Sequence, residues 1–161
     1  MRRGDEDNSL ANLTVSDVDG TGSTYRFDNT REDQVQSAEL GLRGKWQTGE
    51  INHDWVIAAD LYDQEEKGAY AFDPSNTLAT NLYNPTNYAK PAFSNQAIFG
   101  GDTDHLTVTN EKKLQSFALA DTFSLFDDKL KTTVGVRHQN IETTSYDPNT
   151  QAQTAKYDKN E

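Results

Sequence analysis

The amino-acid sequence predicts an all-β fold, an antiparallel up-and-down meander of long hairpins. Three observations carry this prediction. Apolar and polar residues alternate with a period of two along several segments, tight turns alternate with long polar connections, and no helical period is sustained anywhere. Period-two alternation is typical of strands with one apolar face and one polar face.

Composition narrows the class of protein. Of the 161 residues only 34% are hydrophobic, and 26 Asp and Glu against 15 Lys and Arg give a formal charge of -11. This excess of carboxylates argues against a nucleic-acid partner, because phosphate backbones are bound by clustered cations. The absence of cysteine excludes a disulfide scaffold and a thiolate metal site. The longest uninterrupted apolar run, residues 55–59, is too short for a membrane helix.

The first hairpin is predicted from residues 25–47 and 50–66. Its alternation is clearest over residues 38–46, where Leu40 and Leu42 fall in one phase and Arg43 and Lys45 in the other. Residues 47–50 supply a tight turn, after which the alternation resumes from Ile51.

A second hairpin is predicted from residues 106–125 and 130–146, with its turn at 126–129. Asp121 falls in the apolar phase of the first arm. Either a β-bulge or an inverted facing of part of this strand would explain that position, and the sequence leaves both open.

The N-terminal arm, predicted over residues 8–16, alternates more weakly. Long connections are expected at 17–24, 71–104 and 147–155. The middle connection has 34 residues and three of the four prolines. A structureless loop of that size is uncommon inside a compact soluble domain, whereas membrane barrels have short turns at one rim and long loops at the other.

Strand length and aromatic placement also favour a membrane barrel. Arms of roughly 15 residues reach about 50 Å at ~3.3 Å per residue, whereas a tilted membrane strand needs only ~9–11 residues. Trp46 and Trp55 lie close to one short turn, and Phe123 and Phe126 to the other. These are positions where a barrel carries its girdle of aromatic side chains.

Two blocks of the sequence, residues 38–72 and 116–147, resemble the barrel of TonB-dependent siderophore receptors. The similarity is strongest in LADTFSLFDDKL, residues 119–130, followed by TVGVRHQ, residues 133–139. Residues 2–15 are similar to an upstream strand of such a barrel. The resemblance implies a segment of a 22-stranded β-barrel in the bacterial outer membrane, plugged by a separate domain, that imports ferric siderophores.

The partners implied by this resemblance are a ferric siderophore and outer-membrane lipid. Residues 1–161 are expected to form part of the barrel alone, without a plug domain, so that TonB would act only through the missing plug. So few strands cannot close a barrel, because an open edge in hydrocarbon leaves backbone groups without hydrogen-bond partners.

Candidate ligand-binding residues gather in and beside the long connection. Aromatic faces and neutral amides there would stack on a siderophore and hydrogen-bond to it, while cations would offset the charge of an anionic ferric complex. The aromatic candidates are Tyr70, Phe72, Tyr83, Tyr88 and Phe93; the cationic candidates are Arg26 and Lys90, with Arg31 as a further cation. The alternative is that these aromatics pack the loop against itself or its neighbours.

Catalysis, metal binding and a cofactor are not expected. His53, His105 and His138 are dispersed, and the sequence contains neither an H-x-x-x-H pair nor a G-x-S-x-G elbow. The acidic clusters lack calcium-loop spacing and are assigned to solvated strand ends. A secreted or surface all-β module that binds carbohydrate or protein is the alternative function.

Overall fold

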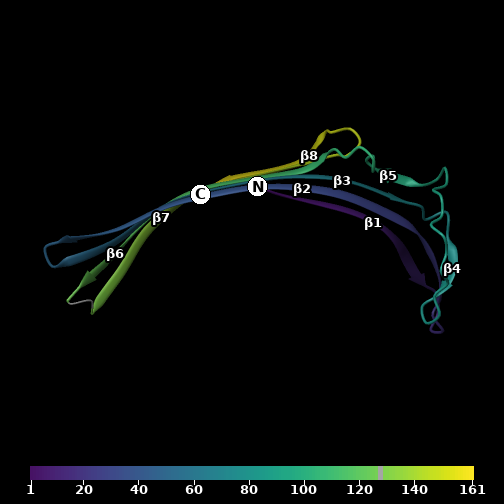
Figure 1. Ribbon diagram of the computed structural model, residues 1–161, viewed down its shortest axis with the longest axis horizontal. Helices are drawn as coiled ribbons and strands as arrows, with labels where there is room; N and C mark the ends of the chain where they lie inside the picture. The colour runs from purple at the N-terminus through teal and green to yellow at the C-terminus, as the bar shows by residue number, and fades with distance from the viewer. Residues whose placement is uncertain (127–128) are drawn as a thin grey trace.

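The computed structural model describes residues 1–126 and 129–161, and over these residues the chain forms one antiparallel β-sheet (Figure 1). The all-β, antiparallel prediction is confirmed. The turn predicted at 126–129 includes residues 127 and 128, which lie outside the described residues. The strands are β1 (Arg2–Val15), β2 (Thr21–Thr48), β3 (Ile51–Phe72), β4 (Leu78–Asn81), β5 (Ile98–Gly100), β6 (Val108–Leu125), β7 (Leu130–Tyr146) and β8 (Gln153–Asn160).

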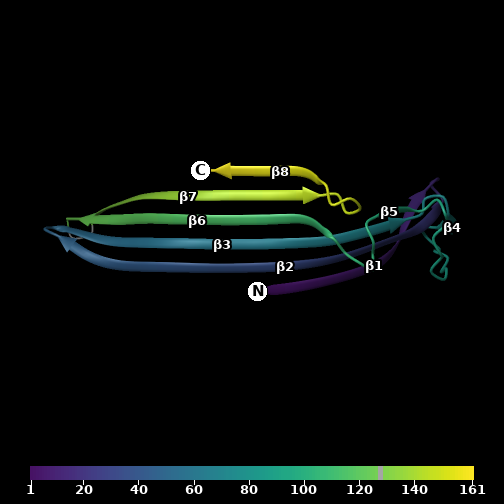
Figure 2. The same cartoon turned by 90° about the horizontal axis from the view of Figure 1, so that it is seen from above.

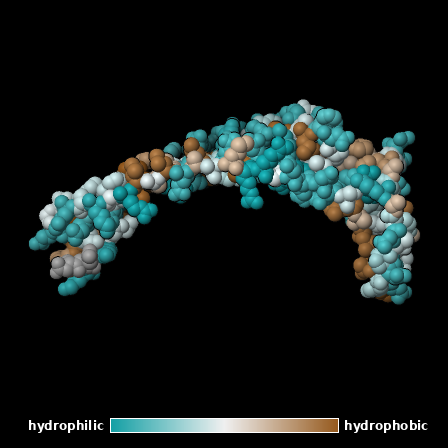
Figure 3. Space-filling model, in the orientation of Figure 1, coloured by the Kyte–Doolittle hydropathy of each residue, from teal (hydrophilic) through white to brown (hydrophobic). Residues whose placement is uncertain are grey.

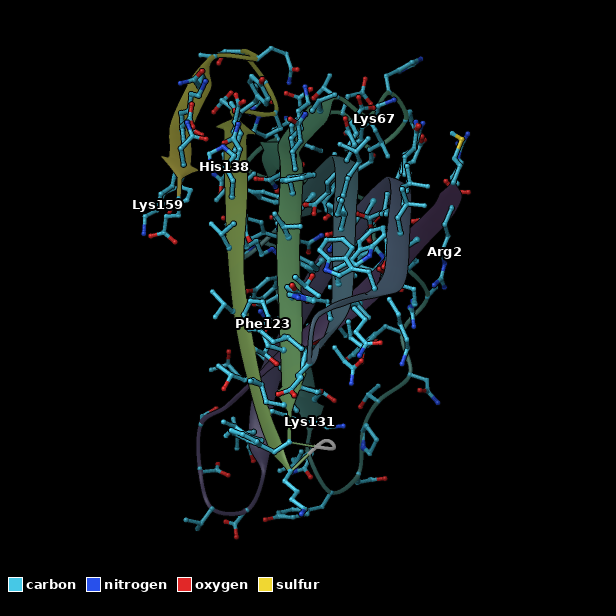
Figure 4. All side chains as sticks on the ribbon, turned by 90° about the vertical axis from the view of Figure 1, so that its left-hand side faces the viewer. Arg2, Lys67, Phe123, Lys131, His138 and Lys159 are labelled. Atoms are coloured by element: carbon cyan, nitrogen blue, oxygen red, sulfur yellow. The ribbon has the colours of Figure 1, made fainter. Side chains whose placement is uncertain are left out.

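The long strands form a meander. Their order across the sheet is β1-β2-β3-β6-β7-β8, while the short strands β4 and β5 pair with β2 and β3 (Figure 2). Seen from the end of the β2–β3 and β6–β7 hairpins, the strands follow one another around a curve rather than lying in one plane (Figure 4). Such curvature is what a segment of a barrel wall requires.

The connections differ strongly between the two ends of the sheet. At one end β2 and β3 are joined by Gly49 and Glu50 alone, directly after the Thr48–Ile51 pair, and Gly49 has a φ of 61°. A positive φ at the first turn residue is typical of a tight hairpin. The turns and loops at 16–20, 73–107 and 147–152 all lie at the other end (Figure 2). We call these the short-turn end and the loop end.

The strands are longer than the alternation indicates: β2 and β3 extend further into the loop end, and β1 extends further toward the middle of the sheet. β1 begins at Arg2 rather than at residue 8, β2 at Thr21 rather than at 25, and β3 ends at Phe72 rather than at 66. In these stretches both faces carry polar residues, so the period of two disappears. Backbone pairing continues nevertheless, from Arg2 with Val35 to Val15 with Gly22.

Two of the predicted long connections contain strands in addition to those predicted from the alternation. Within residues 71–104, β4 pairs with the start of β2 and β5 with the end of β3. The predicted connection 147–155 ends at Gln153, where β8 begins and pairs with β7. Residues 153–160 are almost entirely polar and showed no apolar phase from which a strand could be predicted.

The register places the apolar phases of four strands on one face of the sheet, because directly paired residues share a face. Figure 3 shows hydrophobic side chains on the convex side of the sheet toward the short-turn end. Successive paired rows of this face are Leu40, Ala59, Phe117 and His138; Leu42, Ile57, Leu119 and Val136; Gly44, Trp55, Asp121 and Val134; and Trp46, His53, Phe123 and Thr132. We call these rows, together with the preceding pair of Ala38 and Leu61, the apolar band.

The opposite, concave face is polar or lined by small residues over the same length. Its rows are Glu39, Asp60, Ser116 and Gln139; Gly41, Ala58, Ala118 and Arg137; Arg43, Val56, Ala120 and Gly135; and Lys45, Asp54, Thr122 and Thr133. Val56 is the one larger apolar side chain in these rows. From Ala38 to Trp46 the apolar band extends about 26 Å along the strand, or about 20 Å along a bilayer normal at a tilt of ~40°. This height is close to the ~25 Å apolar belt of outer-membrane barrels.

Neither face of the band is covered by other described residues. The buried hydrophobic residues of the described chain are Ala69 and Ala71, both near the loop end, while Trp46 is 53% exposed. An all-β module that folds in water needs an apolar interior between two layers. Among the described residues, no helix is long and apolar enough to cross a membrane.

Asp121 keeps its place in the apolar phase, so both explanations left open by the sequence are wrong. The ladders of β6 with β3 and with β7 run without a register shift through this residue. Its carboxylate Oδ2 lies 2.7 Å from Nδ1 of His53, and the imidazole packs between Trp46 and Phe123, with ring centroids 5.3 and 5.2 Å away. A hydrogen-bonded pair of polar side chains therefore lies within the apolar band, close to the short turn.

Candidate functional site

Four aromatic rings gather on the concave face at the loop end. Tyr25 and Phe27 come from β2, and Tyr70 and Phe72 from β3. The ring centroid of Phe72 lies 6.4 Å from Tyr25, 6.2 Å from Phe27 and 6.1 Å from Tyr70. These separations fall in the range of favourable aromatic pairs. We call these four residues the rim aromatic cluster.

Strand alternation explains why these rings meet. Phe27 pairs directly with Phe72, and the register of β2 with β3 runs unbroken from this pair to the short turn. Counting along that ladder places all four rings on the face opposite the apolar band. Gly100 of β5 pairs with Tyr70, whose ring occupies the position that a Cβ at Gly100 would need. A side chain at residue 100 would therefore displace the Tyr70 ring.

The structure does not bring the seven sequence-predicted site residues together on one face of the sheet. Tyr70 and Phe72 belong to the rim aromatic cluster, with Tyr70 42% exposed. Arg26 lies in the opposite phase of β2, and its guanidinium carbon lies 3.8 Å from the centre of the Phe93 ring. Lys90 Nζ lies 3.1 Å from Oδ2 of Asp28, on the same face as Arg26.

The two predicted cations share one carboxylate. Arg26 makes an ion pair with Asp28 and donates a hydrogen bond to the carbonyl oxygen of Pro91 at 2.8 Å. Ser9 Oγ donates to Asp28 Oδ1 at 2.7 Å. Asp28 itself is nearly buried. These contacts fasten the segment around Pro91 to the convex face, so Arg26 and Lys90 serve the attachment of the loop.

Asp73 is a second anchor of this loop, and sequence reasoning did not single it out. Its side chain is buried, Oδ2 accepts a hydrogen bond from the Ser94 amide at 2.6 Å, and Oδ1 accepts one from the Asn76 amide at 3.2 Å. The Asp73 amide donates to the Arg26 carbonyl at 3.1 Å. The Ser94 amide holds the pKa of Asp73 below its ordinary value despite burial.

Tyr88 and Tyr83 lie apart from the rim aromatic cluster. Tyr88 lines a groove of about 310 Å³ together with Arg26 and Lys90, and its hydroxyl donates to the Ala79 carbonyl at 2.5 Å. Tyr83 is 74% exposed and lies over Gly20, beside the β1–β2 turn. The chain therefore brings together only two of the five predicted aromatics on the concave face, and it adds Tyr25 and Phe27.

The attachment of the loop through Asp28 is expected to depend on pH. Hydrogen bonds from Arg26 hold the pKa of Asp28 far below its ordinary value. A carboxylate with a lowered pKa stabilises the fold above its unfolded pKa of about 3.9, and this stabilisation is lost as the pH falls further. Amide hydrogen exchange in residues 86–93, corrected for intrinsic rates, should be constant from pH 8 to 5 and accelerate below pH 4. Equal acceleration in Asp28→Asn would contradict this assignment.

Within residues 1–126 and 129–161, no three His, Cys, Asp or Glu side chains gather in a way that could hold a metal ion. Nδ1 of His105 lies 3.2 Å from Oδ2 of Asp102 in the same loop. What the loop end offers a ligand is therefore aromatic surface and hydrogen-bonding groups.

A curved sheet with an apolar convex band, a polar concave face and two unequal rims defines the wall of a membrane β-barrel. No family model matches the chain. It is 30% identical over 107 residues to the ferrichrome receptor FcuA of Yersinia enterocolitica, an alignment of 66% of this chain and 13% of FcuA. The crystal structure of BauA, the ferric preacinetobactin receptor of Acinetobacter baumannii, superposes with a TM-score of 0.68 at 27% identity, over 98% of this chain and 23% of BauA.

These similarities confirm the predicted resemblance to siderophore receptors. The chain is similar to a segment of such receptors, and it spans less than a quarter of the length of either relative. Both relatives are named as receptors and neither as an enzyme, in agreement with the prediction for this chain.

Proposed function

We propose that this chain forms part of the barrel wall of an outer-membrane, TonB-dependent transporter for ferric siderophores. Its loop end would face the outside of the cell and its concave face the lumen. The observation that carries the proposal is the separation of the two faces. The apolar band lies on the convex side (Figure 3). The register places the rim aromatic cluster on the opposite, concave side, at the end where a ligand would enter.

The open edges of the sheet support a larger barrel. Within the described residues, β2 pairs only with β3 from Gln36 to Thr48, and β7 pairs only with β6 from Leu130 to His138, so both strands have an open edge along the apolar band. In hydrocarbon, unpaired backbone groups cost several kcal/mol each, so further strands must complete the wall. A 22-stranded barrel and a plug that contacts TonB would account for the parts of the relatives that this chain does not span.

The alternative, a secreted or surface all-β module, is not favoured. Such a module would expose to water the row Leu42, Ile57, Leu119 and Val136. Contiguous apolar surface of this extent on a soluble monomer would lead to association.

Removal of rings from the rim aromatic cluster is expected to weaken ligand binding. Tyr70→Ala and Phe72→Ala, made in the full-length transporter, should each raise the Kd of the ferric siderophore about tenfold. This corresponds to an aromatic contact of about 1.4 kcal/mol. Equilibrium binding to the purified transporter measures the change. Tyr83→Ala is the matched control, because that ring lies beside the β1–β2 turn, and its Kd should stay within twofold. An effect of Tyr83→Ala as large as that of Tyr70→Ala would contradict the placement of the site.

A further inference from the structure

Resting on the proposed function, we propose that the part of the entrance formed by this chain selects ferric chelates without net negative charge. The chelate would present apolar or aromatic surface to the rim aromatic cluster. The inference joins two observations, the pairing of the four cations in residues 4–31, 67–109 and 145–155 and the placement of the four rings on the concave face.

The loop end is strongly acidic. Residues 4–31, 67–109 and 145–155 contain ten Asp and Glu but only four Lys and Arg, a formal charge of -6 with His neutral. In a cleft lined by one sign of charge, the summed potential repels ligands of the same sign. Such a surface slows and weakens the approach of an anionic complex.

The four cations of these segments are already paired. Arg26 and Lys90 share Asp28 on the convex face. Lys67 lies 3.3 Å from Glu65 and 4.0 Å from Glu32, also in the phase of the apolar band. None of these three cations therefore faces the rim aromatic cluster.

Of these four cations, Arg31 is the one on the concave face. It lies four residues from Phe27 along β2, in the same phase as the four rings. Its Nε lies 2.7 Å from Oδ2 of Asp33, and its Nη2 lies 2.9 Å from Oε2 of Glu66. One guanidinium held between two carboxylates leaves this group with a net negative charge.

The net charge of a ferric chelate determines whether this arrangement opposes its binding. Ferric iron bound by three dianionic catecholates forms a trianion, whereas iron bound by three hydroxamate monoanions is neutral. The trianion must either displace a carboxylate from Arg31 or remain near uncompensated negative charge, and both cost free energy. A neutral chelate avoids that cost, and the aromatic rings still provide contact area for its apolar surface.

The test compares two probes on the full-length transporter, a neutral ferric trihydroxamate and an anionic ferric tricatecholate built on the same backbone. The neutral probe should bind at least about tenfold more tightly at low ionic strength, and the difference should shrink as salt is added. The double variant Asp33→Asn/Glu66→Gln releases Arg31. It should tighten binding of the tricatecholate about tenfold and leave binding of the trihydroxamate within about twofold.

Glu65→Gln is the matched control. It removes one negative charge from the neighbouring position of β3 on the opposite face and does not release Arg31. Tricatecholate binding equal to or tighter than trihydroxamate binding in the unmodified transporter would overturn the inference and leave the proposed function intact. An effect of Glu65→Gln as strong as that of the double variant would overturn it in the same way. Failure of a folded transporter to bind either probe would overturn the proposed function itself.

Discussion

Arginine in place of Val136 is expected to destabilise the barrel in a lipid bilayer by about 2–4 kcal/mol, whereas arginine in place of Thr133 changes stability by less than about 1 kcal/mol. Both residues are exposed positions of β7, three residues apart. Val136 is 67% exposed and lies in the row of Leu42, Ile57 and Leu119 on the apolar band. Thr133 shares the concave face with Lys45 and Asp54.

The physical reason is the medium that each side chain meets. On the convex side a guanidinium would have to enter hydrocarbon, where its desolvation is compensated only by snorkelling or local thinning of the bilayer. On the concave side the same group would remain among polar side chains. Denaturant titration of the full-length barrel refolded into phospholipid vesicles measures both changes. Equal destabilisation by the two substitutions, or a larger effect at Thr133, would show that the faces have been assigned the wrong way round.

Replacement of His53 by Phe is expected to destabilise the barrel by about 2–3 kcal/mol, even though phenylalanine is the more lipophilic side chain. The substitution leaves the Asp121 carboxylate within the apolar band without the imidazole 2.7 Å away. Both side chains are mostly covered, with 13% of His53 and 22% of Asp121 exposed. Loss of one partner from a buried pair leaves an uncompensated charge, which costs more than the pair itself contributes.

The double variant His53→Phe/Asp121→Leu provides the control. With both polar partners replaced by apolar groups, stability should return to within about 1 kcal/mol of the unmodified barrel, or exceed it. The coupling energy from this double-mutant cycle is then at least about 1.5 kcal/mol. Strictly additive effects would mean that the two side chains do not stabilise each other in the membrane.

The alternation of apolar and polar residues predicted the strands most accurately in the part of the sheet where contact with lipid requires one apolar face. Between Ala38 and Leu61 one side of the hairpin must be apolar, and there the period of two indicated the strands and the turn at Gly49. Beyond the membrane the requirement disappears. Residues 2–7, nearly all charged or polar, still pair with β2 through backbone hydrogen bonds, which leave no trace in residue type.

The candidate site could be predicted only in part. The sequence predicts that the first arm of the first hairpin begins at residue 25. When the period of two is continued through its first residues, Arg26 falls on the face opposite to Tyr25 and Phe27. The pairing of Arg26 and Lys90 with Asp28 depends on how the loop folds back over β2, across 62 residues of sequence between Asp28 and Lys90. No local pattern records such a contact. The same holds for His53 and Asp121, which are 68 residues apart.

Nitroxide labels scanned along β7 test the two-faced wall most directly. Single cysteines would replace residues 130 to 137 in turn in the full-length transporter, reconstituted in liposomes, and accessibility to oxygen and to a polar nickel chelate would be compared. Positions 130, 132, 134 and 136 should favour oxygen, which concentrates in hydrocarbon, and the positions between them should favour the chelate or show little access to either. An oxygen signal that is uniform along the strand, or that peaks at 131, 133, 135 and 137, would contradict a wall with one lipid-facing side.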